Sequence, residues 1–193
     1  MISPPCARIP KMRPQENTSA PAAAANAFDA GDVAAILREQ NWLAGEPSVE
    51  QRKWCERAAE LLGPQVSDRA SLLDLLQLVF HYDAHDILGK VESHSVLARY
   101  GARDVIRQLA LLLLDPAPLT SDRFKEMVNA LKDTLGLRSR ELFHPIRLAL
   151  TGRAGEGELD RVILLLDEAA ALPFAVHAQS ARERIVEFCA ALD

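Results

Sequence analysis

The chain has 193 residues, a formal net charge of −5 and a hydrophobic fraction of 49%. This length allows one domain or two small ones, and the acidic balance argues against a protein that binds nucleic acid through a general basic excess. It leaves open an RNA-binding protein that uses a few local arginines. Because only 5% of the residues are aromatic, the core must consist of Leu, Ala, Val and Ile, which favours helices packed on helices.

The N-terminal residues 1–27 differ in composition from the rest of the chain. They hold five prolines and an Ala-rich run without polar–apolar rhythm. Such a segment buries too little surface to offset its ordering entropy. We therefore expect a disordered tail, followed by the folded region from residue 28.

Apolar spacing and stop signals predict helices throughout residues 28–193. Ser48 and Gln51 have capping-box spacing, as do Ser180 and Glu183. Pro145 is expected to open its helix in the first turn, and Gly136 to end the preceding one. The predicted helices are 32–42, 48–62, 67–80, 83–90, 93–98, 101–114, 121–135, 145–151, 156–171 and 180–192.

No stretch shows sustained alternation of polar and apolar residues, so we expect no sheet. The predicted fold class is all-α, a two-part helical bundle with subdomains at 28–137 and 138–193. The longest apolar stretch, Leu109 to Leu114, is too short to span a bilayer and is predicted to be one deeply buried helix. No signal peptide is recognised, and we expect no membrane partner.

The three cysteines, Cys6, Cys55 and Cys189, are far apart and form no C-x-x-C pair. This pattern indicates a reduced, cytoplasmic protein without a disulfide frame or a zinc site. Cys55 and the neighbouring Trp54 are expected to be core or groove residues of an amphipathic helix rather than a nucleophile pair.

The residues from Lys132 to Arg153 are locally basic. They contain five Lys or Arg and two acids, a local charge of +3. Arginines beside the exposed N–H groups of a helix start suit phosphates and splayed bases. The same composition is also typical of an ordinary solvated face.

Residues 142–152 read L-F-H-P-I-R-L-A-L-T-G and are followed by a glycine-bearing loop. This string resembles the anticodon-binding region of bacterial glutamyl-tRNA synthetases, with the pattern L-F-x-P-[LI]-R-x-A-L-T-G. Residues 69–80, which begin R-A-x-x-L and end in phenylalanine, are similar to an earlier helix of that family. The resemblance covers about residues 66–193 and implies a helical anticodon-binding fold.

The resemblance also implies which residues contact tRNA. In the family, the arginine of the motif and the loop after it approach the anticodon, and the arginine of R-A-x-x-L lies near its third base. Arginine suits this task because its planar fork can bind a base edge or a phosphate in two places. The residues expected to bind tRNA are Arg147, Arg140, Arg138, Arg69, Gly157, Leu159 and Glu156.

One departure from the family pattern concerns the loop after the motif. Gly157 stands where the family often has proline, and Glu156 and Glu158 are acids. Acids near a polyanion weaken the expected base contacts. The sequence therefore leaves the recognition of a particular anticodon open.

The implied function is a non-catalytic tRNA-binding module, acting in or derived from tRNA aminoacylation, with tRNA for glutamate as partner and no DNA. The H-I-G-H-like and K-[LM]-S-K-R-like motifs of the family's catalytic domain do not occur in the sequence, nor does a Gly-rich nucleotide loop. We therefore expect no catalytic residues, no cofactor and no activity from this chain alone. A separately encoded synthetase catalytic portion is an expected partner, docked on an apolar patch near Trp42 and Trp54.

Two alternatives remain open. The chain could be a helical protein-interaction module that derives from this fold and no longer binds RNA. Scattered arginines paired with acids would favour that reading, whereas a continuous basic face with Arg147 and Arg140 would favour RNA. The second alternative is a metal-dependent enzyme built on His81 and His85, which are four residues apart. A helix end at this point, with Asp83 as the next N-cap, would disrupt that spacing.

Overall fold

The computed structural model describes residues 27–192, which are helical and contain no strand. The predicted all-α fold class is therefore confirmed, whereas the predicted tail lies outside the described residues except for residue 27. Within this range no helix is both long and apolar enough to cross a membrane. The helices are α1 (Ala30–Glu39), α2 (Val49–Leu62), α3 (Arg69–Phe80), α4 (Ala84–Leu88), α5 (Val91–Leu97), α6 (Ala102–Leu113), α7 (Ser121–Leu135), α8 (Ser139–Thr151), α9 (Glu158–Ala170) and α10 (Ala181–Leu192), with a 3-10 turn at Gly63–Gln65.

Several helix ends form as their local sequence predicts. The Ser48 hydroxyl accepts from the Gln51 N–H at 3.2 Å, and the Gln51 side chain accepts from the Ser48 N–H at 2.8 Å. Ser180 and Glu183 make the same reciprocal pair of bonds. Gly136 ends α7 in the left-handed region at φ +68°. Both predicted capping boxes and the glycine C-cap are confirmed, because these signals act within one turn.

The predicted position of Pro145 is wrong. It lies in the interior of α8, which begins six residues earlier at Ser139. A proline there removes one backbone hydrogen bond. Burial offsets this loss, because Leu142, Pro145, Ile146 and Ala149 form one face of α8 that is buried across the proline.

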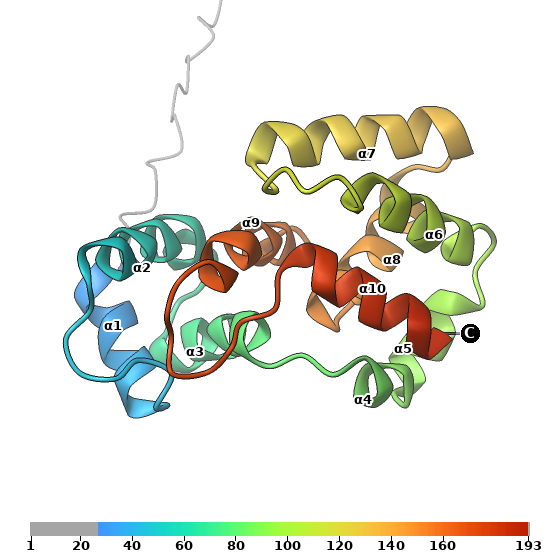
Figure 1. Ribbon diagram of the computed structural model, residues 1–193. Coiled ribbons are helices and arrows are strands. Elements are labelled where there is room, and N and C mark those ends of the chain that lie inside the picture. Colours follow the sequence, from blue (N-terminus) through green and yellow to red (C-terminus); the bar gives the residue numbers. More distant parts are fainter. Residues whose placement is uncertain (1–26, 193) are drawn as a thin grey trace, which may run out of the picture.

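Helix α9 lies at the centre of the molecule (Figure 1), where it packs against α2, α3 and α8. Five consecutive residues, from Val162 to Leu166, are buried, which is the pattern of a helix covered on all sides. At one end of the molecule α10 packs against α4, α6 and α8, and α7 lies outermost against α6. This arrangement leaves the α7–α8 connection and the turn before α6 near the surface.

The prediction that residues 109–114 are deeply buried is wrong for most of the stretch, because only two of its six residues are buried. Leu109 and Leu113 are buried, but Leu111 is 61% exposed and Leu114 is 49% exposed. Helix α6 is covered on one side by α7, α8 and α10. It is therefore an amphipathic helix whose outer face carries leucines.

Trp42 and Trp54 belong to an aromatic core cluster with Phe80 and Phe174. The ring centroids of Trp42 and Phe80 are 4.8 Å apart, and those of Trp54 and Phe174 are 5.3 Å apart. The two tryptophans are only 3% and 2% exposed. The predicted docking patch near them is wrong, because their neighbours in the fold already cover their rings. The core position predicted for Trp54 and Cys55 is confirmed.

Candidate functional site

Helix α8 and the loop after it hold most of the residues that the sequence singled out. Arg138 is the N-cap of α8, Arg140 lies in its first turn and Arg147 in its second half. Glu156 and Gly157 lie in the exposed loop before α9, whereas Leu159 is buried at 2% exposure. The structure brings α8 and this loop together. Arg69, at the start of α3, instead pairs with Glu39 of α1 at 2.7 Å.

Arg147 is buried and links α8 to the start of α9. Its Nε and Nη2 donate to the two carboxylate oxygens of Asp160 at 2.7 and 2.8 Å, and its Nη1 donates to the Gly155 carbonyl at 2.7 Å. The residue is only 7% exposed, and its guanidinium lies over the Phe143 ring. The hydrogen-bond donors of the guanidinium are therefore occupied by partners within the protein. These bonds fix the loop that the resemblance assigns to the anticodon.

Arg153, at the start of the same loop, joins it to α3. It forms a bidentate ion pair with Asp74 of α3, with Nη2 and Oδ1 2.8 Å apart. This pairing holds the pKa of the Asp74 carboxyl below its usual value. Gly152 has φ +78°, and a Cβ there would lie 2.9 Å from the Ile87 side chain. Glycine suits this turn because it has no Cβ. The backbone at the end of α8 can therefore lie directly against Ile87 of α4.

Arg184 is a buried guanidinium that the sequence analysis did not identify. It is fully buried and donates to the carbonyls of Leu78, Val79 and Leu150 at 2.6 to 2.8 Å, and to that of Gln179 at 3.1 Å. Burial lowers its pKa to about 10, so it stays charged at neutral pH. It satisfies carbonyls in the last turns of α3 and α8, which lack helical partners, and thus joins these two helices to α10.

Exposed basic side chains surround the α7–α8 connection. Lys132, Arg138 and Arg140 are exposed, and Lys132 and Arg138 form no ion pair with a carboxylate among residues 27–192. The start of α8 has no side-chain cap, so N–H groups of its first turn are available to an anion. A hollow of about 310 Å³ lies here, lined by Val128, Asn129, Lys132, Arg138, Ser139, Leu142 and Phe143.

Arg99 joins this region from the turn before α6. Its Nη1 lies 2.9 Å from Nδ1 of His144, the histidine of the L-F-H-P-I-R motif. Burial lowers the pKa of His144, and the positive charges of Arg99, Arg147 and Arg140 lower it further. The two residues are 45 positions apart, and no sequence signal could have joined them.

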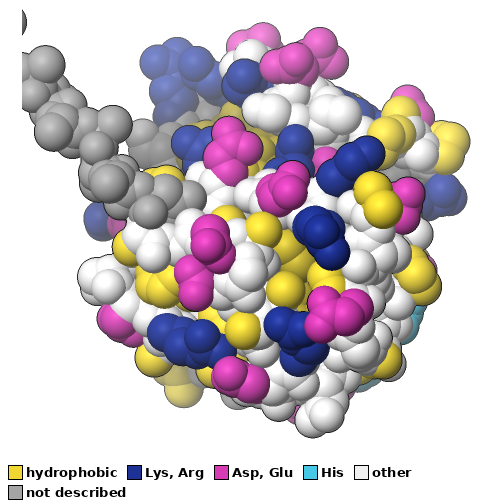
Figure 2. All heavy atoms as spheres, turned by 90° about the vertical axis from the view of Figure 1, so that its left-hand side faces the viewer, with side chains coloured by type: hydrophobic (Ala, Val, Ile, Leu, Met, Phe, Trp, Pro, Cys, Tyr) yellow, Lys and Arg dark blue, Asp and Glu magenta, His cyan; other side chains and the backbone are white. Residues whose placement is uncertain are grey.

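Charge on the opposite end of the molecule is mixed. Figure 2 views the side on which α1 and α2 lie, and basic and acidic side chains alternate there without a continuous basic area.

Three of the arginines that the sequence predicted to bind tRNA form ion pairs: Arg69, Arg140 and Arg147 pair with Glu39, Glu156 and Asp160. This pairing matches the pattern expected of a protein-interaction module, whereas Lys132 and Arg138 do not share it.

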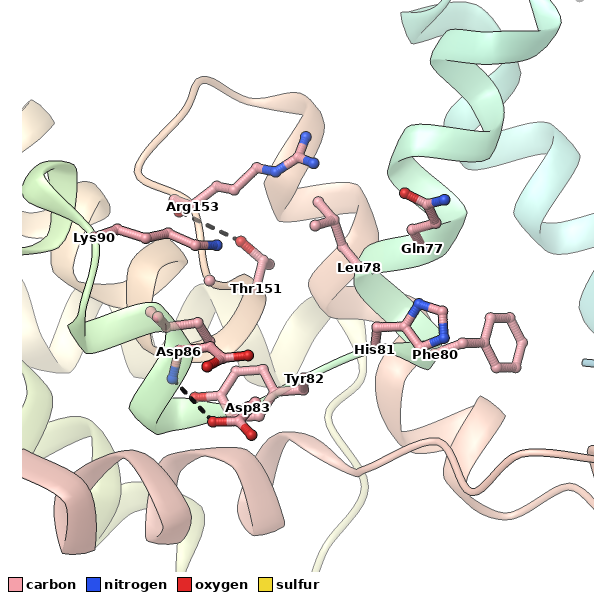
Figure 3. A pocket seen from close by; sticks show the side chains of 12 residues that line it. Gln77, Leu78, Phe80, His81, Tyr82, Asp83, Asp86, Lys90, Thr151 and Arg153 are labelled. Carbon is pink, nitrogen blue, oxygen red and sulfur yellow. Dashed lines mark hydrogen bonds between the residues drawn. The ribbon is translucent and has the colours of Figure 1, made fainter. Parts of the chain in front are cut away.

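A hollow of about 480 Å³ lies where α4 faces the turn after α8. Lys90 reaches toward Thr151 across it, and Asp83 and Asp86 line its other side (Figure 3). Asp83 is the N-cap of α4, so the predicted helix end is confirmed and His81 and His85 do not share one helix. No group of three or more potential metal ligands lies together among residues 27–192.

Comparisons with known proteins point in one direction. The family model described as the anticodon binding domain matches residues 25–172. Over 124 residues, 64% of this chain and 25% of the ligase, the chain is 32% identical to a glutamate–tRNA ligase of Geobacillus stearothermophilus. It is 27% identical to the glutamate–tRNA ligase of Bacillus subtilis (strain 168) over 70% of this chain and 28% of the ligase. The chain thus spans about a quarter of the length of the curated relatives it matches. No solved structure matches it.

Proposed function

This chain belongs to the anticodon binding domain family, and from that premise we propose that it binds tRNA through the exposed basic residues at the start of α8. We propose tRNA for glutamate as the ligand, because the relatives named above are glutamate–tRNA ligases. The catalytic step would come from a synthetase catalytic portion, which is the proposed protein partner.

The observation that carries the proposal is the group Lys132, Arg138 and Arg140 around the uncapped start of α8. A phosphate there would meet guanidinium and ammonium groups together with backbone N–H groups of the first helical turn. This position is also where the motif that resembles the anticodon-binding region begins. The support therefore comes from charge, backbone geometry and family membership at one place.

The ion pairs of the other arginines decide how each could take part. Both side chains of the Arg140–Glu156 pair are at least 70% exposed, and an exposed pair contributes only about 0 to 1 kcal/mol. An RNA phosphate can therefore replace Glu156. Arg147 is different, because it is buried and bidentate to Asp160. We propose that Arg147 positions the loop at Glu156 and Gly157, and that Arg138 and Arg140 contact the RNA.

Filter binding of a tRNA transcript for glutamate, across a salt series, tests this proposal. Wild-type protein should bind saturably and more weakly as salt rises. The double variant Arg138→Ala/Arg140→Ala should lower the affinity and reduce the salt slope by about 1.4 to 1.8, since each lost phosphate contact contributes about 0.7 to 0.9. The matched control is Arg52→Ala/Lys53→Ala, which removes the same charge from exposed positions on α2.

Two outcomes would count against the proposal. Equal losses in the two double variants would mean that the RNA senses only net charge and has no site at α8. No saturable binding even at low salt would leave the protein-interaction module as the better interpretation. The ion pairs at Arg69, Arg140 and Arg147 favour that alternative, whereas the comparisons lend it no support. For the protein partner, recovery of no synthetase in a pull-down from the source cells would contradict the proposed association.

A further inference from the structure

Tyr100 is an exposed aromatic side chain in a protein that buries its aromatic rings. It is 89% exposed, whereas every other aromatic residue of the sequence, all within residues 27–192, is buried or half-buried. A ring this exposed contributes little to the fold. The ring is therefore available to a ligand at the surface.

Two contacts seat the turn of Tyr100 against the start of α8. Gly101 has φ +73°, and a Cβ there would lie 2.6 Å from the Leu137 side chain. A larger residue would be strained at this φ and would force the Leu137 side chain to shift, so glycine lets this turn lie directly against the α7–α8 connection. On the other side of Tyr100, the Arg99 guanidinium meets His144 of α8 at 2.9 Å. Tyr100 thus lies between two residues that both touch the basic region described above.

The two segments that meet here, residues 99–104 and 138–141, carry four basic and two acidic residues. Neither Arg99 nor Arg138 forms an ion pair with a carboxylate in the described part of the chain. The neighbouring acids along the chain, Asp104 and Glu141, are exposed to solvent.

We propose that Tyr100 is a stacking platform for an unpaired base of the bound RNA, with Arg99 holding an adjacent phosphate. An exposed aromatic face set among arginines is the arrangement that binds single-stranded nucleic acid, because each base has a face to stack and each nucleotide has a phosphate to pair. This inference rests on the proposed tRNA binding and adds a contact with the unpaired part of the RNA.

Substitutions at Tyr100 test the stacking. The RNA probes are a hairpin with the anticodon stem and its unpaired loop, and a fully paired duplex of the same stem. Tyr100→Ala should weaken hairpin binding about 5- to 150-fold, since one base stacked on an aromatic ring contributes about 1 to 3 kcal/mol, and should leave duplex binding unchanged. Tyr100→Phe should keep wild-type affinity because it keeps the ring. Arg99→Ala should lower the salt slope by about 0.7, whereas Tyr100→Ala should not change it.

Fluorescence gives a second measurement that does not depend on affinity. Tyr100→Trp adds an exposed tryptophan, whose emission the hairpin should quench on stacking. The matched control is Val49→Trp, because Val49 is 66% exposed at the start of α2, at the other end of the molecule (Figure 1). Its emission should not change.

The outcomes separate this inference from the proposed function. If wild-type protein binds the hairpin and Tyr100→Ala binds it equally well, the stacking is wrong and tRNA binding stands. If Tyr100→Ala weakens hairpin and duplex alike at an unchanged unfolding midpoint, Tyr100 contacts the backbone and the stacking is again wrong. If wild-type protein binds neither RNA, the proposed function and this inference fall together.

Discussion

The two ends of α8 use arginine in different ways. At its C-terminal end, Arg147, Arg153 and Arg184 all donate to acceptors within the protein, which are Asp160, Asp74 and backbone carbonyls. At its N-terminal end, Arg138 and the nearby Arg99 have no carboxylate partner among residues 27–192, and Arg140 has only the exposed Glu156. The charge at the first end stabilises the architecture, and the charge at the second end is available to a ligand. Substitutions at the first end should therefore change stability, and those at the second end should change RNA affinity.

The largest effect is expected for Arg184→Met. The substitution keeps apolar volume but leaves four carbonyls without their donor. Each buried acceptor without a partner costs about 1 to 3 kcal/mol, so we expect a loss of about 3 kcal/mol or more in urea unfolding. Arg182→Met, on the exposed side of α10, should stay within about 0.5 kcal/mol of wild type. Comparable stability of the two variants would show that the carbonyls find other partners.

A smaller loss is expected for Arg147→Ala. Asp160, whose side chain is 25% exposed, would lose its bidentate partner. A fully buried pair broken in this way costs about 3 to 5 kcal/mol, and the exposure of Asp160 reduces our expectation to about 2 to 3 kcal/mol of unfolding free energy. Arg138→Ala should leave stability within about 0.5 kcal/mol and weaken tRNA binding instead. The comparison between the two ends fails if Arg147→Ala lowers affinity without lowering stability.

A side chain at Gly152, in the turn after α8, should lower the stability of the fold. Gly152→Ala would place a Cβ at φ +78° and 2.9 Å from Ile87. Strain of this kind costs about 1 to 3 kcal/mol, which thermal unfolding can measure. Gly136 is the matched control, because it has φ +68° but nothing within 4 Å of a Cβ. Gly136→Ala should therefore cost less, and an equal cost would mean that the contact with Ile87 adds nothing.

The smallest effect concerns pH. The Arg153 guanidinium lowers the pKa of Asp74 in the folded protein, so the pair stabilises the fold above the unfolded pKa of about 3.9. This contribution is lost as pH falls through the lower folded pKa. Both side chains are about half exposed, so the effect should be small. In acid-unfolding curves, Asp74→Asn should flatten the decline below pH 4, and an unchanged curve would contradict the pairing.

Local sequence determined much of this fold. The all-α class, both capping boxes, the glycine end of α7 and the N-cap at Asp83 follow from signals that act within a single helical turn. The motif at residues 142–152 predicted the family that the comparison confirms. The interior position of Pro145 was missed, because the apolar face that α8 buries on both sides of the proline depends on what packs against it.

The tertiary structure alone decided which charges are available. The sequence gives no reason why Arg147 should meet Asp160 or why Arg184 should reach the carbonyls of Leu78 and Val79, 106 and 105 positions away. It also does not predict that the Arg99 guanidinium contacts the ring of His144 rather than a carboxylate. Helix periodicity fixes which side of a helix a residue occupies, but the partner on that side depends on which other helix packs there. A charge count can therefore predict a basic segment, and only the packing separates the arginines that hold the fold from those that remain available to RNA.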